Sequence, residues 1–139
     1  MANALYTTTA ICKGGRAAGK VALVDGGLWF HNEHSKPLGG WGEGTTPEQL
    51  FAMGWPTCFN GAVLFIAGQK KIDASKAVVK CEVGIGRDDA GLALSAKLTL
   101  AVPGLDRAQV QELLEAAHQA CPYSKATRGN IPVELAVEA

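Results

Sequence analysis

The chain lacks an excess of charge of either sign. Its 139 residues include 13 basic and 13 acidic side chains, so the formal net charge at pH 7 is zero with neutral histidines. A zero net charge gives no bulk attraction to nucleic acid or to an anionic membrane. The sequence also lacks a basic N-terminal region followed by an apolar run, so we expect no secretory signal and a cytoplasmic protein.

The four cysteines lack the close spacing of a metal-binding or disulfide framework. Cys12, Cys58, Cys81 and Cys121 are far apart in the sequence, and no two of them form a C-x-x-C pair. In a cytosolic chain this spacing argues against structural disulfides and zinc ribbons, but it leaves room for a reactive pair. Cys12 and Cys81 fall in strand patterns and are expected to be inert packing residues.

Two other patterns lack a residue that their chemistry needs. Residues 14–20 nearly match a phosphate-binding P-loop, but Val21 stands where a Ser or Thr would bind magnesium, and the segment leads into a strand. His31, Glu33 and His34 could be metal ligands. No complementary set of ligands occurs elsewhere, which favours solvated histidines.

The length and the order of predicted elements indicate the fold class. We predict that residues 1–139 form a single domain, because the chain can build one core and shows no internal repeat or linker. The predicted order is strands, helix, strands, helix, strand, which indicates an α+β fold with helices packed on antiparallel sheet. Strands are predicted at 5–12, 20–24, 28–31, 77–86, 91–102 and 131–137, and glycine-rich loops at 14–19 and 32–44.

The organising stretch is an apolar helix that begins after Thr46. Thr46 is a good N-cap, Pro47 suits the first helical position, and Glu48 places a negative charge at the positive end of the helix dipole. The apolar residues that follow lie on every face, which is typical of a buried central helix. At Pro56 we expect a kink, or a break with a second helix starting there. In the second case Cys58 would lie in the first turn, where free amide groups favour a thiolate.

A second helix is predicted after Asp106. Asp106 can cap it, with Gln109 in the capping-box position. Its apolar residues follow helical spacing: Val110, Leu113, Leu114, Ala117 and Cys121. We expect Pro122 to end this helix and His118 to lie at its surface.

Seven segments of the chain, in their order, carry a resemblance to one protein family. They are Leu5-Tyr6-Thr7-Thr8, Gly14-Gly15-Arg16, Pro47-Glu48-Gln49-Leu50-Phe51-Ala52, Cys58-Phe59, Val83-Gly84-Ile85-Gly86, Pro103-Gly104-Leu105-Asp106-Arg107 and the run from Cys121-Pro122-Tyr123 to Ile131. Together they resemble the organic hydroperoxide resistance proteins of the OsmC/Ohr family. The resemblance covers nearly the whole chain.

The resemblance implies a thiol peroxidase that reduces organic hydroperoxides to alcohols without metal, flavin or haem. By position, Cys58 matches the peroxidatic cysteine and Cys121 the resolving cysteine. Arg16 matches the activating arginine, and Glu48 matches its carboxylate partner. These roles are chemically reasonable, because a guanidinium beside a buried thiol favours the thiolate. The resemblance also implies a dithiol reductant, such as a lipoyl group or a lipoylated protein, and an intertwined homodimer.

The apolar residues near Cys58 indicate a substrate class. We expect Phe51, Trp55 and Phe59 to line a pocket that favours bulky organic peroxides over hydrogen peroxide, which gains nothing from apolar burial. The same pocket would suit a non-catalytic module that binds an apolar ligand, and the cysteine pair would suit a thiol redox sensor. Both remain alternatives to the peroxidase.

The spacing of Glu48 and Cys58 predicts a dimer. They are ten residues apart, which is about 15 Å along a straight helix. An arginine held by Glu48 cannot easily span that distance. Either the helix bends sharply at Gly54 and Pro56, or Glu48 meets Cys58 of a second copy. A two-fold interface would also cover the excess apolar surface of the helix.

Overall fold

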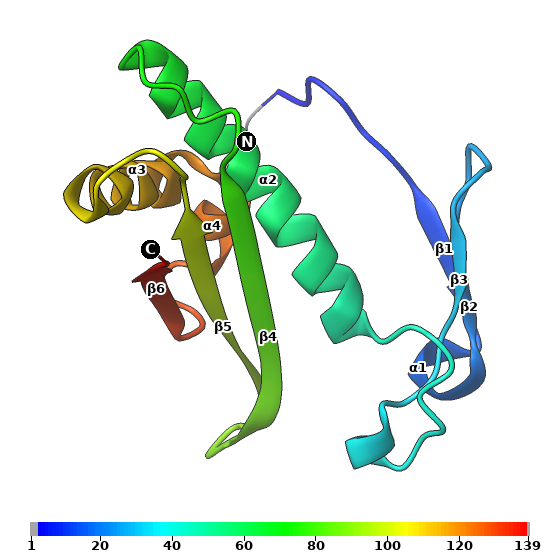
Figure 1. Cartoon of the computed structure of the whole chain (residues 1–139). Coiled ribbons are helices and arrows are strands. Elements are labelled where there is room, and N and C mark those ends of the chain that lie inside the picture. Colours follow the sequence, from blue (N-terminus) through cyan, green and yellow to red (C-terminus); the bar gives the residue numbers. More distant parts are fainter. Residues whose placement is uncertain (1–2, 139) are drawn as a thin grey trace. The chain divides into compact units, whose positions relative to one another are not determined.

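The structure is a computed structural model that describes residues 3–138. The chain divides into two compact units, Met1–Leu50 and Phe51–Ala139. The elements of the first unit are β1 (Ala10–Lys13), α1 (Gly15–Ala18), β2 (Lys20–Leu23), β3 (Trp29–His31) and the 3-10 helix η1 (Lys36–Leu38). Helix α2 (Pro47–Gln69) begins in this unit and continues into the second (Figure 1). The second unit then has β4 (Val78–Asp88), β5 (Gly91–Ala101), α3 (Arg107–Ala120), α4 (Pro122–Thr127) and β6 (Val133–Val137).

The first unit is a small antiparallel sheet in the order β1-β2-β3. Its first strand is shorter than predicted, because pairing begins at Ala10 and not at Leu5. The residues before it, including Leu5 and Tyr6, are fully or largely exposed, so the β propensity of this stretch is not supported by packing. The predicted glycine-rich loop at 14–19 contains the single turn of α1.

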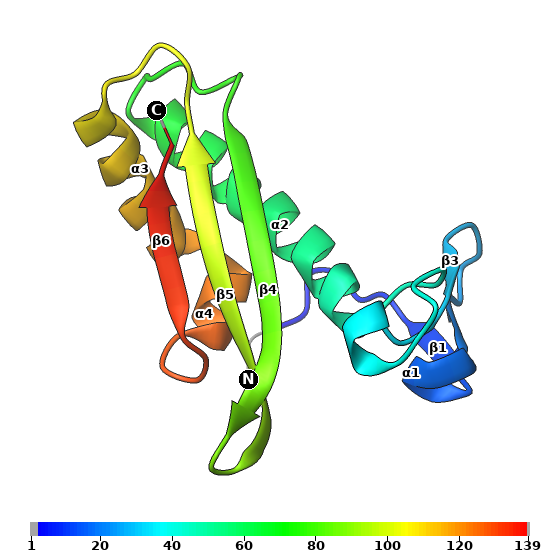
Figure 2. The same ribbon diagram turned by 60° about the horizontal axis from the view of Figure 1, so that its bottom comes forward.

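The second unit is a three-stranded sheet covered by helices on one face. Figure 2 shows β4, β5 and β6 side by side. The strands β4 and β5 form a long hairpin in which Asp88 pairs with Gly91, so the first strand continues two residues beyond its predicted end at residue 86. The α+β fold with antiparallel strands is as predicted, except that β6 runs parallel to β5. The chain crosses from β5 to β6 through α3 and α4, which is the long connection that parallel neighbours need.

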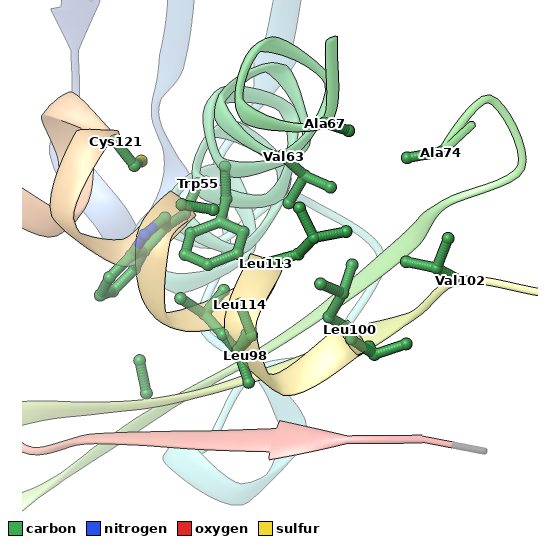
Figure 3. Packing of buried hydrophobic residues seen from close by; sticks show 14 residues of the cluster. Trp55, Val63, Ala67, Ala74, Leu98, Leu100, Val102, Leu113, Leu114 and Cys121 are labelled. Atoms are coloured by element: carbon green, nitrogen blue, oxygen red, sulfur yellow. The ribbon is translucent and has the colours of Figure 1, made fainter. Parts of the chain in front are cut away.

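The core of the second unit lies between α2, β5 and α3 (Figure 3). Its fully buried large side chains include Trp55 and Phe59 from α2, Leu98 from β5, and Leu113 and Leu114 from α3. Helix α3 begins with the predicted capping box. The Asp106 carboxylate accepts from the Gln109 amide, and the Gln109 side chain accepts from the Asp106 amide.

At Pro56 the sequence left two alternatives open, a kink or a break. The helix is continuous from Pro47 to Gln69, so the break is wrong, and Cys58 does not begin a new helix. Proline inside a helix costs roughly 3 kcal/mol. Burial of Trp55 and Phe59 on either side of Pro56 offsets that cost, at about 1.5–3 kcal/mol for each large apolar side chain.

Within the single chain, helix α2 is buried on one side only. Its buried residues, Trp55, Phe59, Val63 and Ala67, form one stripe at a spacing of four residues. The rest of its apolar surface includes Met53, Leu64 and Phe65, which are 50%, 46% and 62% exposed. By length and composition alone α2 could cross a membrane. The buried stripe packed on β5 and α3 instead identifies it as a core helix.

Two leucines of the second unit provide a matched test of this core. Leu113→Ala should lower the free energy of unfolding by roughly 2–5 kcal/mol, because the side chain is fully buried and a cavity remains. Leu92→Ala should change it by about 0.5 kcal/mol or less, because that side chain is 67% exposed. Chemical denaturation monitored by circular dichroism measures both. Equal losses in the two variants would contradict the core described here.

Candidate active site

Two cysteine thiols are in direct contact in the second unit. Cys58 lies on α2, and the Cys121 thiol donates a hydrogen bond to its sulfur, with the two Sγ atoms 3.4 Å apart. Both cysteines are free thiols. In a disulfide the sulfurs are about 2.05 Å apart, so a shift of little more than 1 Å would join them. The structure therefore brings together the two cysteines that the sequence singled out.

Cys121 is held at a sharp turn between two helices. It is both the C-cap of α3 and the N-cap of α4. Its amide donates to the carbonyl of Ala117 at 2.8 Å. Pro122 ends α3 as predicted, because proline cannot continue a helix but suits the first position of a new one. Helix α4 itself was not predicted. Cys121 is fully buried, so the turn presents its thiol to Cys58 and not to solvent.

The second unit alone does not activate Cys58. Burial raises the pKa of the Cys58 thiol, the Tyr123 amide lowers it by a hydrogen bond, and the Cys121 thiol raises it further. The net effect is a raised pKa, so this environment keeps Cys58 as a thiol at neutral pH. A nucleophilic Cys58 needs a positive charge supplied from outside these contacts.

The first unit contains a bidentate arginine–carboxylate pair. Arg16 donates from Nη1 to Oε2 of Glu48 at 3.1 Å and from Nη2 to Oε1 at 2.9 Å. The Glu48 side chain is 13% exposed and that of Arg16 35%. Burial would raise the pKa of Glu48, but the hydrogen bonds from Arg16 and from its own amide, with the charge of Arg16, lower it overall. The guanidinium is therefore held in one orientation by a carboxylate that stays ionised.

Local backbone requirements place both members of the pair. Glu48 lies in the first turn of α2, where the predicted cap forms: the Thr46 hydroxyl accepts from the Gln49 amide, and the Gln49 side chain accepts from the Thr46 amide. Arg16 lies on α1. The turn at Gly14 has a φ of 79°, and a Cβ at Gly19 would stand 2.2 Å from a backbone oxygen, so both positions require glycine.

Asn32 is a positioning residue that the sequence did not reveal. It is buried, and its amide group donates to the Gly15 carbonyl at 3.2 Å and to the Cys12 sulfur at 3.4 Å. The Asn32 backbone amide also donates to the Gly19 carbonyl at 2.8 Å. These bonds tie the α1 turn, and hence Arg16, to the end of β3. A polar residue in a polar loop gives no sequence signal, because its partners are distant in the chain.

The three aromatic residues expected around a pocket differ in exposure. Trp55 and Phe59 are fully buried core residues, so their own surfaces are not open to a ligand. Phe51 is partly buried, and its ring stacks on that of Tyr123 at 6.1 Å between centroids and lies 5.2 Å from that of Trp55. Tyr123 is 40% exposed. Phe51 therefore stays a candidate for substrate contact, and Tyr123 joins it.

The remaining cysteines are outside the site. Cys81 faces the core of the second unit, and burial, with the charge of Glu82, raises its pKa to about 11, so it is inert as predicted. Cys12 is exposed, so the prediction that it packs in a core is wrong: β1 is an edge strand with all four residues exposed.

The histidines do not form a metal centre. Among residues 3–138, no group of three or more His, Cys, Asp and Glu side chains could hold a metal ion. Glu33 instead accepts from the backbone amides of Trp41, Glu43 and Gly44, which lower its pKa, and so fixes the loop after η1. His118 is half-buried and not at the surface as predicted. Burial lowers its pKa, with the charge of Arg128 adding to the effect.

Two free thiols in contact are an arrangement that can form and break a disulfide. The model of the OsmC-like protein family matches residues 40–136. The chain is 45% identical over 133 residues to an organic hydroperoxide resistance protein of Xanthomonas axonopodis pv. citri, covering 94% of this chain and 93% of that protein. It is 40% identical over 134 residues to organic hydroperoxide resistance protein OhrB of Bacillus subtilis, covering 95% and 97%.

Solved structures agree with the sequence matches. The crystal structure of an organic hydroperoxide resistance protein from Legionella pneumophila matches with a TM-score of 0.92 and 38% identity, over 99% of this chain and 100% of that one. The crystal structure of B. subtilis OhrB matches with a TM-score of 0.87 and 38% identity, over 97% and 100%. The chain belongs to the OsmC/Ohr family, as its sequence motifs predicted.

The Arg16–Glu48 pair makes the stability of the α1 turn depend on pH. The folded-state pKa of Glu48 lies below its ordinary value of 4.5, so its stabilising contribution is complete above 4.5 and is lost as the pH falls through the lowered pKa. Amide hydrogen exchange of residues 15–18 should therefore be slower in the wild type than in Glu48→Gln at neutral pH. The ratio of the exchange rates in the two proteins should approach one well below pH 4.5. A ratio that does not change with pH would contradict the ion pair.

Proposed function

We propose that the protein is a thiol-dependent peroxidase that reduces organic hydroperoxides to alcohols. The observation that carries the proposal is the 3.4 Å contact between the Cys58 and Cys121 sulfurs. The names of the relatives from X. axonopodis and B. subtilis support organic hydroperoxides as the substrate class. The chain's membership of the family supports a role in resistance to oxidative stress.

Cys58 is the peroxidatic residue in this proposal. Its thiolate attacks the outer peroxide oxygen and the O–O bond breaks, so that the outer OH group stays on sulfur and Cys58 becomes a sulfenic acid. The alkoxide leaves and takes up, through solvent, the proton that the Cys58 thiol released, which gives the alcohol. Cys58 fits this role because it is partly exposed, whereas Cys121 is fully buried. A peroxide can thus reach Cys58 directly, and the buried Cys121 reacts only afterwards, with Cys58.

Cys121 is the resolving residue. It attacks the sulfenic sulfur, the S–O bond breaks, water leaves, and a disulfide forms before a second peroxide can drive Cys58 to the irreversible sulfinic state. A dithiol reductant, such as a lipoyl group, then restores both thiols. A dithiol suits a buried partner sulfur, because its second thiol completes the exchange within the same complex.

The Arg16–Glu48 pair supplies the charge that Cys58 lacks. A raised pKa leaves little thiolate for attack. A guanidinium beside the sulfur would favour the thiolate, and Glu48 holds the Arg16 fork in a single orientation. Arg16, Glu48, Cys58 and Cys121 thus form one catalytic group in the proposal, with Phe51 and Tyr123 contacting the organic part of the peroxide.

A homodimer is part of the same proposal. Glu48 and Cys58 are ten residues apart on α2, which is about 15 Å along a straight helix. The exposed apolar side chains Met53, Leu64 and Phe65 on α2 give a two-fold interface the surface it needs. We infer that Arg16 of one copy activates Cys58 of the other, in a cytoplasmic homodimer.

The two cysteines should fail in different ways. Cys58→Ser should abolish consumption of tert-butyl hydroperoxide, because a serine hydroxyl gives no accessible anion here. Cys121→Ser should react once and then accumulate sulfinic acid at Cys58. Intact-protein mass spectrometry after peroxide treatment separates these states. Cys81→Ser is the control and should turn over as the wild type, since Cys81 is inert. A Cys121→Ser protein that cycles normally with dihydrolipoamide would remove Cys121 from the proposed role.

Removal of the arginine charge should make Cys58 less acidic and less reactive. Arg16→Ala should raise the pKa of Cys58, measured by thiolate absorbance in the Cys12→Ser background, and slow its reaction with peroxide. Lys13→Ala, which removes a cation from the neighbouring strand, is the control. An unchanged Cys58 pKa in Arg16→Ala would contradict the activation.

Mixed dimers test which copy supplies the arginine. Co-refolding Arg16→Ala with Cys58→Ser subunits creates one intact site per heterodimer if the charge comes from the partner. Peroxidase activity should then return in the mixture. No recovery from a verified heterodimer, or full activity in a monomer during analytical ultracentrifugation, would reject the arrangement.

A further inference from the structure

The chain at the start of α4 carries two groups that act on the Cys58 sulfur. The Cys121 thiol donates to it, and the Tyr123 amide favours its thiolate form. Helix α4 has only six residues and is too short to be stable alone. Contacts from outside α4 must therefore hold this turn against α2.

One buried hydrogen bond joins the two cysteine-bearing segments directly. The indole Nε1 of Trp55 donates to the hydroxyl of Ser124 at 3.3 Å, and both residues are fully buried. Trp55 precedes Cys58 by three residues on α2, and Ser124 follows Cys121 by three residues. Residues three apart share a helix face, so this bond and the sulfur contact cross the same interface.

The stacking of Tyr123 on Phe51 also lies at this interface, but it holds the interface more weakly than the buried hydrogen bond does. The Tyr123 ring stacks on Phe51 and lies close to position 54, where a Cβ would be a tight 3.2 Å from the tyrosine hydroxyl. Tyr123 is partly exposed, however, and stacking fixes a ring less sharply than a buried hydrogen bond fixes a hydroxyl. Figure 3 shows Trp55 and Cys121 in the same core cluster.

We propose that Ser124, bonded to Trp55, is a positioning residue that keeps the Cys121 thiol within reach of Cys58 and so sets how readily the two form a disulfide. Without this bond the α4 turn samples positions in which the sulfurs are farther apart. The effective concentration of Cys121 at Cys58 then falls, because a reaction within one molecule depends on how often its groups meet. The consequence for peroxide turnover rests on the proposed function, but the geometric claim does not.

Equilibrium with glutathione measures the geometry without any peroxide. The two thiols and one oxidised glutathione give the Cys58–Cys121 disulfide and two reduced glutathiones. The ratio of disulfide to dithiol protein at a fixed glutathione composition therefore reports the effective concentration of Cys121 at Cys58. Loss of one hydrogen bond should lower it by roughly fivefold in Ser124→Ala and in Trp55→Phe, which keeps an aromatic ring. The double variant should lose no more than the larger single loss, because both changes break the same bond.

Two further variants separate positioning from general damage. Ser124→Thr keeps the hydroxyl and should retain most of the wild-type effective concentration. Thr127→Val is the matched control: it removes a buried hydroxyl from the same short helix, but one that bonds to the Tyr123 and Ser124 carbonyls within α4 and not to α2. Its effective concentration should equal that of the wild type.

The outcomes are distinct. Wild-type effective concentration in folded Ser124→Ala or Trp55→Phe, or additive losses in the double variant, would overturn the positioning role. If Ser124→Ala does not fold, Trp55→Phe decides. With tert-butyl hydroperoxide, Ser124→Ala should oxidise Cys58 at the wild-type rate but accumulate more sulfinic acid. A wild-type Cys58 that does not react with peroxide would reject the proposed function and leave the glutathione result standing.

Discussion

The contact between the Cys58 and Cys121 sulfurs is the constraint on which the rest of the second unit depends. It requires a helix that stays regular through Pro56, a chain that turns sharply at Pro122, and a core that buries Trp55 between them. Each requirement has a cost in backbone hydrogen bonding or in conformational freedom, and apolar burial offsets it. The result is two sulfurs held 3.4 Å apart, of which that of Cys58 belongs to a partly exposed residue.

The burial that holds the two sulfurs together also disfavours the thiolate form of Cys58. The apolar surroundings that hold Cys58 in place also raise its pKa, and the Tyr123 amide does not offset this effect. The chain carries a fixed guanidinium in its other unit, paired to a carboxylate whose pKa is lowered. The exposed apolar side chains of α2, Met53, Leu64 and Phe65, are the physical reason for proposing a second copy of the chain.

Sequence reasoning succeeded where the signal is local. The caps at Thr46 and Asp106 and the alternation along β4 and β5 depend on neighbouring residues, and the structure confirms them. It failed where distant packing decides. Core burial around Pro56 prevents the predicted break, and β6 pairs parallel to β5 because of the crossover that precedes it. The hydrogen bond of Ser124 could not be predicted, because its partner is an indole 69 positions away in the sequence.

The most direct test of the account is the fate of one molar equivalent of tert-butyl hydroperoxide added to the fully reduced protein without other thiols. The account predicts one equivalent of tert-butanol, loss of two hydrogens from the protein, and one new crosslinked peptide pair that contains Cys58 and Cys121. An alcohol yield without that crosslink, or oxidation that falls on Cys12 or Cys81 instead, would contradict it.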